Sequence, residues 1–291
     1  MVRTTVEIPT RVLVMGMAHE DGTIHAGEVY PVAEACGQTP DQVRSCLRRL
    51  TAEGLFERDG NGRDALYRAT AAGTAALGTY LERTRLAYVQ DAAGRGWDRR
   101  WHLVGFAVPE GRRAARDALR DRLRFLGGAA VQGGLYVSPH PWHKDVLATA
   151  DQLGVGEFVT VASTDDLEIA GERDPRELAR KLWPIEKLAG EYEALLEQFD
   201  WVVPRLDEMK NRKEKLPDSA FLPMALAMAV AYADTFNHDP LLPPELLPRP
   251  WPGRAARDLV ARSRRLAVTI RQSPGRPALF RLFDDAVEAL P

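Results

Sequence analysis

The sequence has little cysteine and none of the short motifs that mark common enzymes. Its 291 residues include only Cys36 and Cys46, which make no disulfide framework, and no histidine or cysteine lies at metal-ligand spacing. We therefore expect no metal site. A nucleophile elbow, a P-loop and a dinucleotide fingerprint are also missing. The sequence predicts no catalytic residues and no cofactor.

An excess of either charge is also missing. The chain carries 39 Lys and Arg against 41 Asp and Glu, and no lysine occurs in residues 1–95. Net charge alone therefore does not predict a nucleic-acid partner. The sequence shows no signal peptide, and its longest uncharged apolar run, 219–233, is shorter than the ~18–20 residues that span a bilayer. We expect a cytoplasmic protein without a membrane partner.

The most informative segment begins with a well-marked helix at residue 40. Thr39 is a good N-cap, Pro40 suits the first helical position, and Gln42 completes a capping box. Apolar residues then follow at i, i+3, i+4 and i+7, which predicts one buried stripe. These residues are Val43, Cys46, Leu47 and Leu50. The stripe leaves the arginines of this helix on other faces.

A hairpin follows this helix. Gly54 ends the helix, residues 55–58 form a strand, 59–62 (DGNG) supply the turn, and 65–68 return. A recognition helix beside an arginine-bearing hairpin is typical of a winged helix-turn-helix. The segment therefore predicts binding to double-stranded operator DNA.

The side chains off the buried stripe form the predicted DNA-binding set. They are Gln42, Arg44, Ser45, Arg48 and Arg49 on the helix, and Arg58, Arg63 and Arg68 on the hairpin. Either Arg44 or Arg48 could bind a guanine edge bidentately, worth about 1–3 kcal/mol of discrimination, while the hairpin arginines would bind phosphate or the minor groove. The alternative is that some arginines only pair with neighbouring acids, and we expect at least one to do so. These acids are Glu53, Glu57, Asp59 and Asp64.

The remaining sequence predicts further helices and one more sheet. An Ala-rich helix over 70–93 carries Leu77, Leu81, Thr84 and Tyr88 at 4-3-4 spacing, which either forms a dimer seam or only packs on its own domain. Between 100 and 161, strand, helix, strand, helix and strand alternate, which indicates a ferredoxin-like domain with a fourth strand not placed by the pattern. Helical periodicity dominates from 174 onward. The fold class is α+β.

Five long segments are distinctive: VRSCLRRLTAEGLFER, WDRRWHLVGFAVPE, LRDRLRFLGGAAVQGGLYVSPH, LARKLWPIEKLAGEYEALLEQF and DPLLPPELLPRPWPGRAA. Together they resemble the PaaX-like regulators, the repressor family of phenylacetic acid degradation. The resemblance implies a winged helix over 1–70, a linker helix over 71–95, a Cas2-like dimerisation domain over 96–172 and a helical effector-response domain over 173–291. It also implies a homodimeric repressor that an aromatic acyl-CoA thioester, such as phenylacetyl-CoA, releases from DNA.

Candidate effector contacts lie in the central segment, apart from Trp183 in the helical segment that follows. Outward arginines at 113, 116, 120 and 124 could hold the phosphates of a CoA group, but with Asp117 and Asp121 between them a solvated face is the favoured alternative. Trp101, Tyr136 and Trp183 could line an acyl pocket, although such aromatic residues more often form core. One departure bears on the ligand: residues 231–233 read Ala-Tyr-Ala where the family would have an arginine.

The central domain admits a second function, because Cas2-like folds include metal-dependent nucleases. Such nucleases place an aspartate at the end of the first strand, where two chains share a metal ion. Here that strand ends at Pro109 with only Glu110 beyond it. The sequence therefore favours a regulator over an enzyme.

Overall fold

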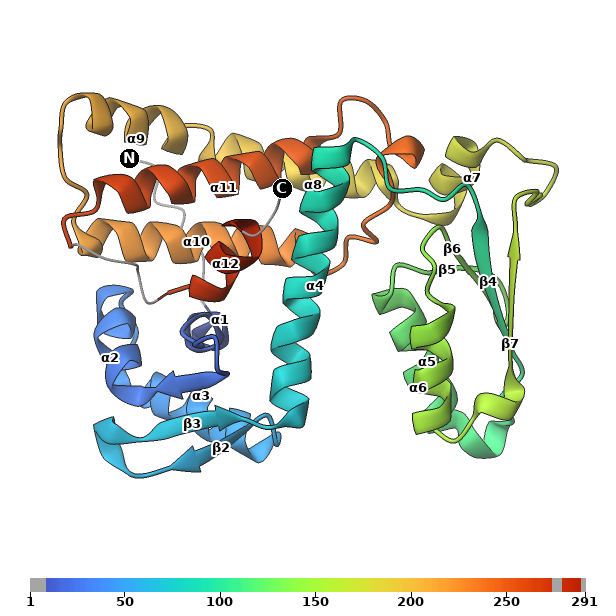
Figure 1. The fold of residues 1–291 in the computed structure, drawn as a ribbon, viewed down its shortest axis with the longest axis horizontal. Coiled ribbons are helices and arrows are strands. Elements are labelled where there is room, and N and C mark those ends of the chain that lie inside the picture. Colours follow the sequence, from blue (N-terminus) through green and yellow to red (C-terminus); the bar gives the residue numbers. More distant parts are fainter. Residues whose placement is uncertain (1–8, 274–278, 289–291) are drawn as a thin grey trace. The chain divides into compact units, whose positions relative to one another are not determined.

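The computed structural model describes residues 9–273 and 279–288, and it is a mixed helix and sheet fold (Figure 1). The chain divides into two compact units. Unit 1 comprises 1–89, 193–234 and 253–291, and unit 2 comprises 90–192 and 235–252. Unit 1 thus combines the N-terminal segment with most of the C-terminal helices. The functions expected for segments 1–70, 71–95, 96–172 and 173–291 stay predictions.

The N-terminal part of unit 1, called the head below, covers residues 9–70. Its three antiparallel strands have the order β1-β3-β2, with Phe56 paired to Ala69 across the hairpin. Buried side chains such as Leu13, Ile24 and Val29 fill its core. The elements are α1 Thr10–Gly16, β1 Thr23–His25, α2 Ala26–Ala35, α3 Pro40–Ala52, β2 Phe56–Asp59, the 3-10 turn Gly62–Asp64 and β3 Leu66–Ala69.

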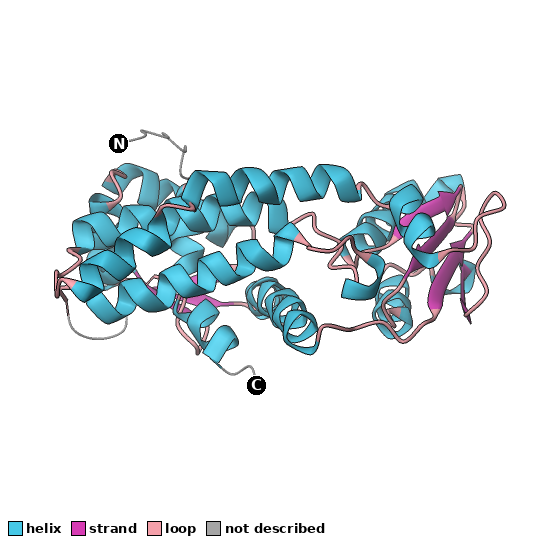
Figure 2. Ribbon diagram, turned by 90° about the horizontal axis from the view of Figure 1, so that it is seen from above, coloured by secondary structure: helices cyan, strands magenta, loops and turns pink. Residues whose placement is uncertain are grey.

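Helices make up the rest of unit 1 (Figures 1 and 2). They are α4 Ala71–Ala93, α9 Val202–Asn211, α10 Asp218–Phe236, α11 Pro252–Ile270 and α12 Arg281–Glu288, with the end of α8 Ile185–Phe199. On α4, Thr84 is fully buried and the Tyr88 hydroxyl donates to the Arg257 carbonyl at 3.1 Å. Thr84 and Tyr88 of the predicted seam therefore have contacts within unit 1, and the dimer seam stays a prediction.

One described helix, α10, is long and apolar enough to cross a membrane by length and composition. Only 44% of its apolar window is buried inside the protein. The core helix of a soluble protein meets the same criterion, so this single helix is weak evidence for a membrane span.

Unit 2 is built on a four-stranded antiparallel sheet of order β5-β6-β4-β7. With two intervening helices, this is the ferredoxin-like β-α-β-β-α-β arrangement predicted from the sequence. The strand that the pattern did not place is β5, directly before β6. The elements are β4 Trp101–Phe106, α5 Arg113–Phe125, β5 Ala129–Gln132, β6 Leu135–Ser138, α6 His143–Gln152 and β7 Val159–Thr164, with 3-10 turns at Glu110–Arg112 and Gly156–Phe158.

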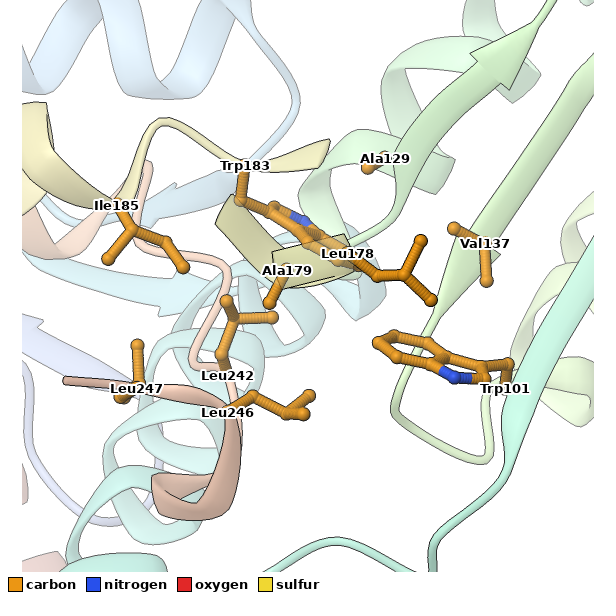
Figure 3. Packing of buried hydrophobic residues seen from close by; sticks show 10 residues of the cluster. All are labelled: Trp101, Ala129, Val137, Leu178, Ala179, Trp183, Ile185, Leu242, Leu246 and Leu247. Carbon is orange, nitrogen blue, oxygen red and sulfur yellow. The ribbon is translucent and has the colours of Figure 1, made fainter. Parts of the chain in front are cut away.

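Both faces of this sheet are covered. Leu119 and Leu123 of α5 and Val146 of α6 pack on one face. The other face is covered by α7, Pro175–Leu182, and by the proline-rich segment that contains the 3-10 turn Pro244–Leu246. Figure 3 shows residues of this second core between α7, that segment and the strands. Leu242, Leu246 and Leu247 of the proline-rich segment are buried in this core, so the segment is a packed crossover.

Candidate nucleic-acid interface

The start of α3 is fixed by the capping box expected from the sequence. The Thr39 hydroxyl accepts from the Gln42 backbone N–H at 3.3 Å, and the Gln42 side-chain Oε1 accepts from the Thr39 backbone N–H at 2.7 Å. Pro40 occupies the first turn, where a missing N–H costs nothing. The two reciprocal bonds satisfy donors that every helix start leaves open.

The rotation of α3 is fixed by its buried stripe. Four side chains of this helix are at most 2% exposed, namely Val43, Cys46, Leu47 and Leu50. Because successive residues of a helix are about 100° apart, this stripe turns the other side of α3 outward. Gln42, Arg44, Arg48 and Arg49 are exposed there, and Ser45 is partly buried. The predicted reading side chains therefore reach solvent.

Two of these side chains already have partners. The Gln42 amide oxygen is used in the capping box, which leaves its NH₂ group for another contact. The Arg44 guanidinium donates to Asp41 one turn earlier, and this bond raises the pKa of Arg44, with a smaller contribution from Tyr30 of α2. Sequence reasoning missed Asp41 and Tyr30, although the i, i+3 spacing of Asp41 and Arg44 was a usable signal.

Arg48 and Arg49 differ from Arg44 because neither forms an ion pair within the described part of the chain. The acid nearest in sequence, Glu53, is instead bound by Arg11 at 2.7 Å. Two adjacent exposed guanidinium groups of α3 are thus available to an external anion. Arginine binds phosphate and guanine edges bidentately when it is free to do so.

The hairpin between β2 and β3 carries the remaining three arginines. Gly60 and Gly62 adopt φ of +78° and +64°, which the turn requires and which glycine adopts without strain. Arg68 lies 4.0 Å from Asp59, which confirms that at least one arginine pairs with a neighbouring acid. Arg58 donates to the Asn61 side chain at 3.2 Å. Arg63 is exposed and has no ion pair among the described residues.

The strand register separates two of the hairpin arginines. Arg58 is opposite Tyr67, whereas Arg68 is opposite Glu57. Directly opposed residues share a face and neighbours alternate, so Arg58 and Arg68 lie on opposite faces of the sheet. The two therefore cannot both approach one groove from the same side of the sheet.

The candidate phosphate-binding arginines of unit 2 form an ion-pair network along α5. Arg116 contacts Glu110 at 2.6 Å, Arg120 contacts Asp117 at 3.4 Å, and Arg124 contacts Asp121 at 3.9 Å. Arg113 lies 3.6 Å from Asp117. The bond to Glu110 raises the pKa of Arg116. This is the arrangement expected of a solvated, charge-balanced face.

The three candidate aromatic residues lie in the interior of unit 2. Trp101, Tyr136 and Trp183 are at most 5% exposed. Trp101 stacks on Trp183, and Tyr136 stacks on Phe106. The Trp183 indole N–H donates to the Gly127 carbonyl at 3.0 Å. These rings pack as core, and contact with a ligand would require them to leave it.

The nuclease alternative gains no support from the residues described. Glu110, the acid nearest the end of β4, pairs with Arg113 and Arg116. Among residues 9–273 and 279–288, no group of three or more His, Cys, Asp or Glu side chains is placed to hold a metal ion. Buried His102 contacts Asp98 at 2.9 Å, and exposed His238 contacts Glu191 at 2.6 Å.

Two consecutive segments of the chain match known protein families. Residues 94–179 match the family described as PaaX protein central Cas2-like domain, and residues 183–270 match the PaaX-like protein C-terminal domain. The chain is 28% identical over 245 residues to the transcriptional repressor PaaX of Escherichia coli strain K12, covering 84% of this chain and 74% of that protein. The solved structure of the uncharacterized protein Rv0674 from Mycobacterium tuberculosis covers 89% of this chain and 95% of its own, with TM-score 0.49 and 20% identity.

Proposed function

The chain belongs to the PaaX family, and we propose that it is a transcriptional repressor that binds double-stranded operator DNA. The head supplies the contacts as a winged helix-turn-helix: α3 enters the major groove and the β2–β3 hairpin lies beside it. Two copies bind as a homodimer, joined through the Cas2-like domain of unit 2, and read two half-sites.

The observation that carries this proposal is the pair Arg48 and Arg49. Their helix is held by a capping box and a fully buried stripe, so the helix face on which they lie is fixed before any partner arrives. Neither is neutralised by an acid within the described residues. Preorganised, exposed arginines on the open face of a helix suit an anionic partner with a groove as wide as a helix.

The predicted DNA-binding residues differ in the contact that each makes with DNA. Arg48 binds a guanine edge or a phosphate, and Arg49 binds a phosphate. The Arg44 guanidinium donates to Asp41, so Arg44 binds DNA only if this bond breaks or if the guanidinium contacts Asp41 and DNA together. Arg44 therefore contributes less to DNA binding than Arg48 does. Gln42 and Ser45 contribute polar groups near the start of the helix. On the hairpin, Arg63 binds the backbone or minor groove, together with either Arg58 or Arg68, which lie on opposite faces of the sheet.

The effector is an aromatic acyl-CoA thioester such as phenylacetyl-CoA, a proposal that rests on the family. The α5 arginines 113, 116, 120 and 124 are the candidate phosphate contacts, and they would exchange Asp117, Asp121 and Glu110 for the ligand. Effector and operator must weaken each other's binding by the same factor, because binding free energies are linked.

The test starts from DNA of random sequence. Duplexes retained by the purified protein are selected over several rounds, and the enriched duplex is then titrated with phenylacetyl-CoA, with free CoA and with phenylacetate. The proposal predicts an enriched sequence with two related half-sites and release by the thioester alone. Failure to enrich any sequence contradicts operator binding, and enrichment without release contradicts only the effector.

A further inference from the structure

We propose that residues 279–284, named the clasp, position the head against α4 and α11 of unit 1. Two residues anchor the clasp: its own Arg281, which binds the head, and Arg264 of α11, which binds the clasp. This role rests on the proposed function, because it concerns the head that would bind DNA. Figure 1 shows α12, which begins within the clasp, beside α1. The clasp, the head and α11 all belong to unit 1.

The first anchor binds the head. Arg281 lies 3.0 Å from His19 Nδ1 and 3.1 Å from Glu28 Oε2 of α2. Because a guanidinium group only donates, His19 Nδ1 accepts from Arg281, and its Nε2 then donates to Glu28 at 2.8 Å. Arg281 is only 18% exposed, so these bonds are partly shielded from water.

The clasp also contacts α1 through its backbone. The Phe280 N–H donates to the Gly16 carbonyl at the end of α1, at 2.6 Å. A Cβ at Gly16 would lie 2.5 Å and 2.8 Å from two carbons of the Phe280 ring. Gly16 does not have a positive φ, so the close approach of Phe280 is the reason that this position needs glycine. Leu279, next to it, is fully buried.

The second anchor, Arg264, joins the clasp to α11. Arg264 of α11 contacts both carboxylate oxygens of Asp284, at 2.9 Å and 2.8 Å, and donates to the Leu279 carbonyl at 2.6 Å. Arg264 and Asp284 are 10% and 11% exposed. Tyr88 of α4 contacts Phe283 edge to face. A single six-residue segment therefore joins α1 and α2 to α4 and α11.

This geometry gives the clasp a positional task. α3 must reach DNA at a set distance from its partner's α3, and the head is attached to α4 by one covalent connection. A loose head would still bind one half-site, but it would lose entropy when two heads bind together. The clasp removes that freedom in advance.

The test uses Arg281→Ala and Gly16→Ala in the full chain, with Arg262→Ala as the matched control. Arg262 is on the same helix as Arg264 and forms an exposed ion pair with Asp207, away from the clasp. Hydrogen exchange of α1 and α2 is measured without DNA. Affinity is then measured for the two-half-site operator and for a duplex with one half-site.

The proposal predicts faster hydrogen exchange in α1 and α2 for both clasp variants, and the wild-type exchange rate for Arg262→Ala. It predicts operator affinity lower by about fivefold or more, the lower end of typical coupling between sites, with one-half-site affinity unchanged. Unchanged exchange, unchanged operator affinity, or an equal loss on both duplexes overturns it, the last because it indicates general destabilisation. If the wild-type protein binds no duplex, the proposed function fails, positioning for DNA fails with it, and exchange alone reports whether the clasp holds the head.

Discussion

Trp101 of β4 and Trp183 after α7 stack with ring centroids 6.3 Å apart and planes 16° from parallel. The contact joins the second face of the ferredoxin-like sheet to the helical segment that follows it in sequence (Figure 3). Through its indole N–H, Trp183 also holds the Gly127 carbonyl before β5. The pair is therefore part of the core that makes unit 2 one body.

Replacing Trp183 by alanine should destabilise the chain by about 3–5 kcal/mol, because it removes a buried indole and leaves a cavity. Trp201 is the matched control, since it is 55% exposed and its alanine variant should change stability little. Urea unfolding followed by circular dichroism measures both. Equal stability of the two variants would contradict the core role of Trp183.

Thr39→Ala should lower stability by about 1 kcal/mol, because it removes the side-chain half of the capping box. Thr79→Ala on α4 is a suitable control: its hydroxyl bonds only to the Ala75 carbonyl within its own helix, where alanine is at least as favourable. Chemical denaturation of the three proteins measures the difference. A Thr39→Ala variant no less stable than Thr79→Ala would show that the cap contributes nothing.

Both cysteines should react slowly with a thiol reagent at pH 8. Burial raises the pKa of Cys36 to about 11 and raises that of Cys46. For Cys36 the reactive thiolate is then on the order of one part in a thousand. Ellman's reagent should label the native chain slowly and label two thiols rapidly in guanidinium. Rapid reaction of one native thiol, assigned with Cys36→Ser, would contradict this environment.

Acid should destabilise unit 2 partly through His143. Burial, and secondarily the charge of His102, lower the pKa of His143 below its ordinary 6.5. The folded chain then binds its proton less readily than the unfolded chain, so stability is full above pH 6.5 and is lost as pH falls from there through the folded-state pKa. Thermal unfolding between pH 7.5 and 5.5 should show a smaller loss for His143→Gln than for wild type. Parallel curves would refute this assignment.

The sequence predicted the features that depend on neighbouring residues. The capping box of α3, its buried stripe and the glycine turn of the hairpin all follow from local spacing. The alternation of strands and helices also indicated the ferredoxin-like topology. Each of these signals is confined to a few turns or one strand, where periodicity and turn chemistry act.

Features set by distant contacts were not predictable in this way. β5 reads AAVQ, without alternation or aromatic residues, and α9 has Pro204 near its start, so neither produced a clear pattern. Glu53 pairs with Arg11 and therefore not with Arg48 or Arg49. This pairing depends on the packing of α1 on α3, which no local pattern indicates. The contact of Arg281 with His19 spans most of the chain length and has no sequence signal.

DNA binding through α3 is tested most directly by the salt dependence of binding to the selected duplex, measured by fluorescence anisotropy. Wild type is compared with the Arg48→Ala/Arg49→Ala double variant and with Arg205→Ala, which removes a positive charge from an ion-paired position on α9. Each lost phosphate contact should reduce the slope of log K against log salt by about 0.9. The double variant should bind more weakly, with a slope reduced by about 1 to 2, and Arg205→Ala should bind as wild type does. A double variant that binds with wild-type affinity and slope would contradict DNA binding through α3.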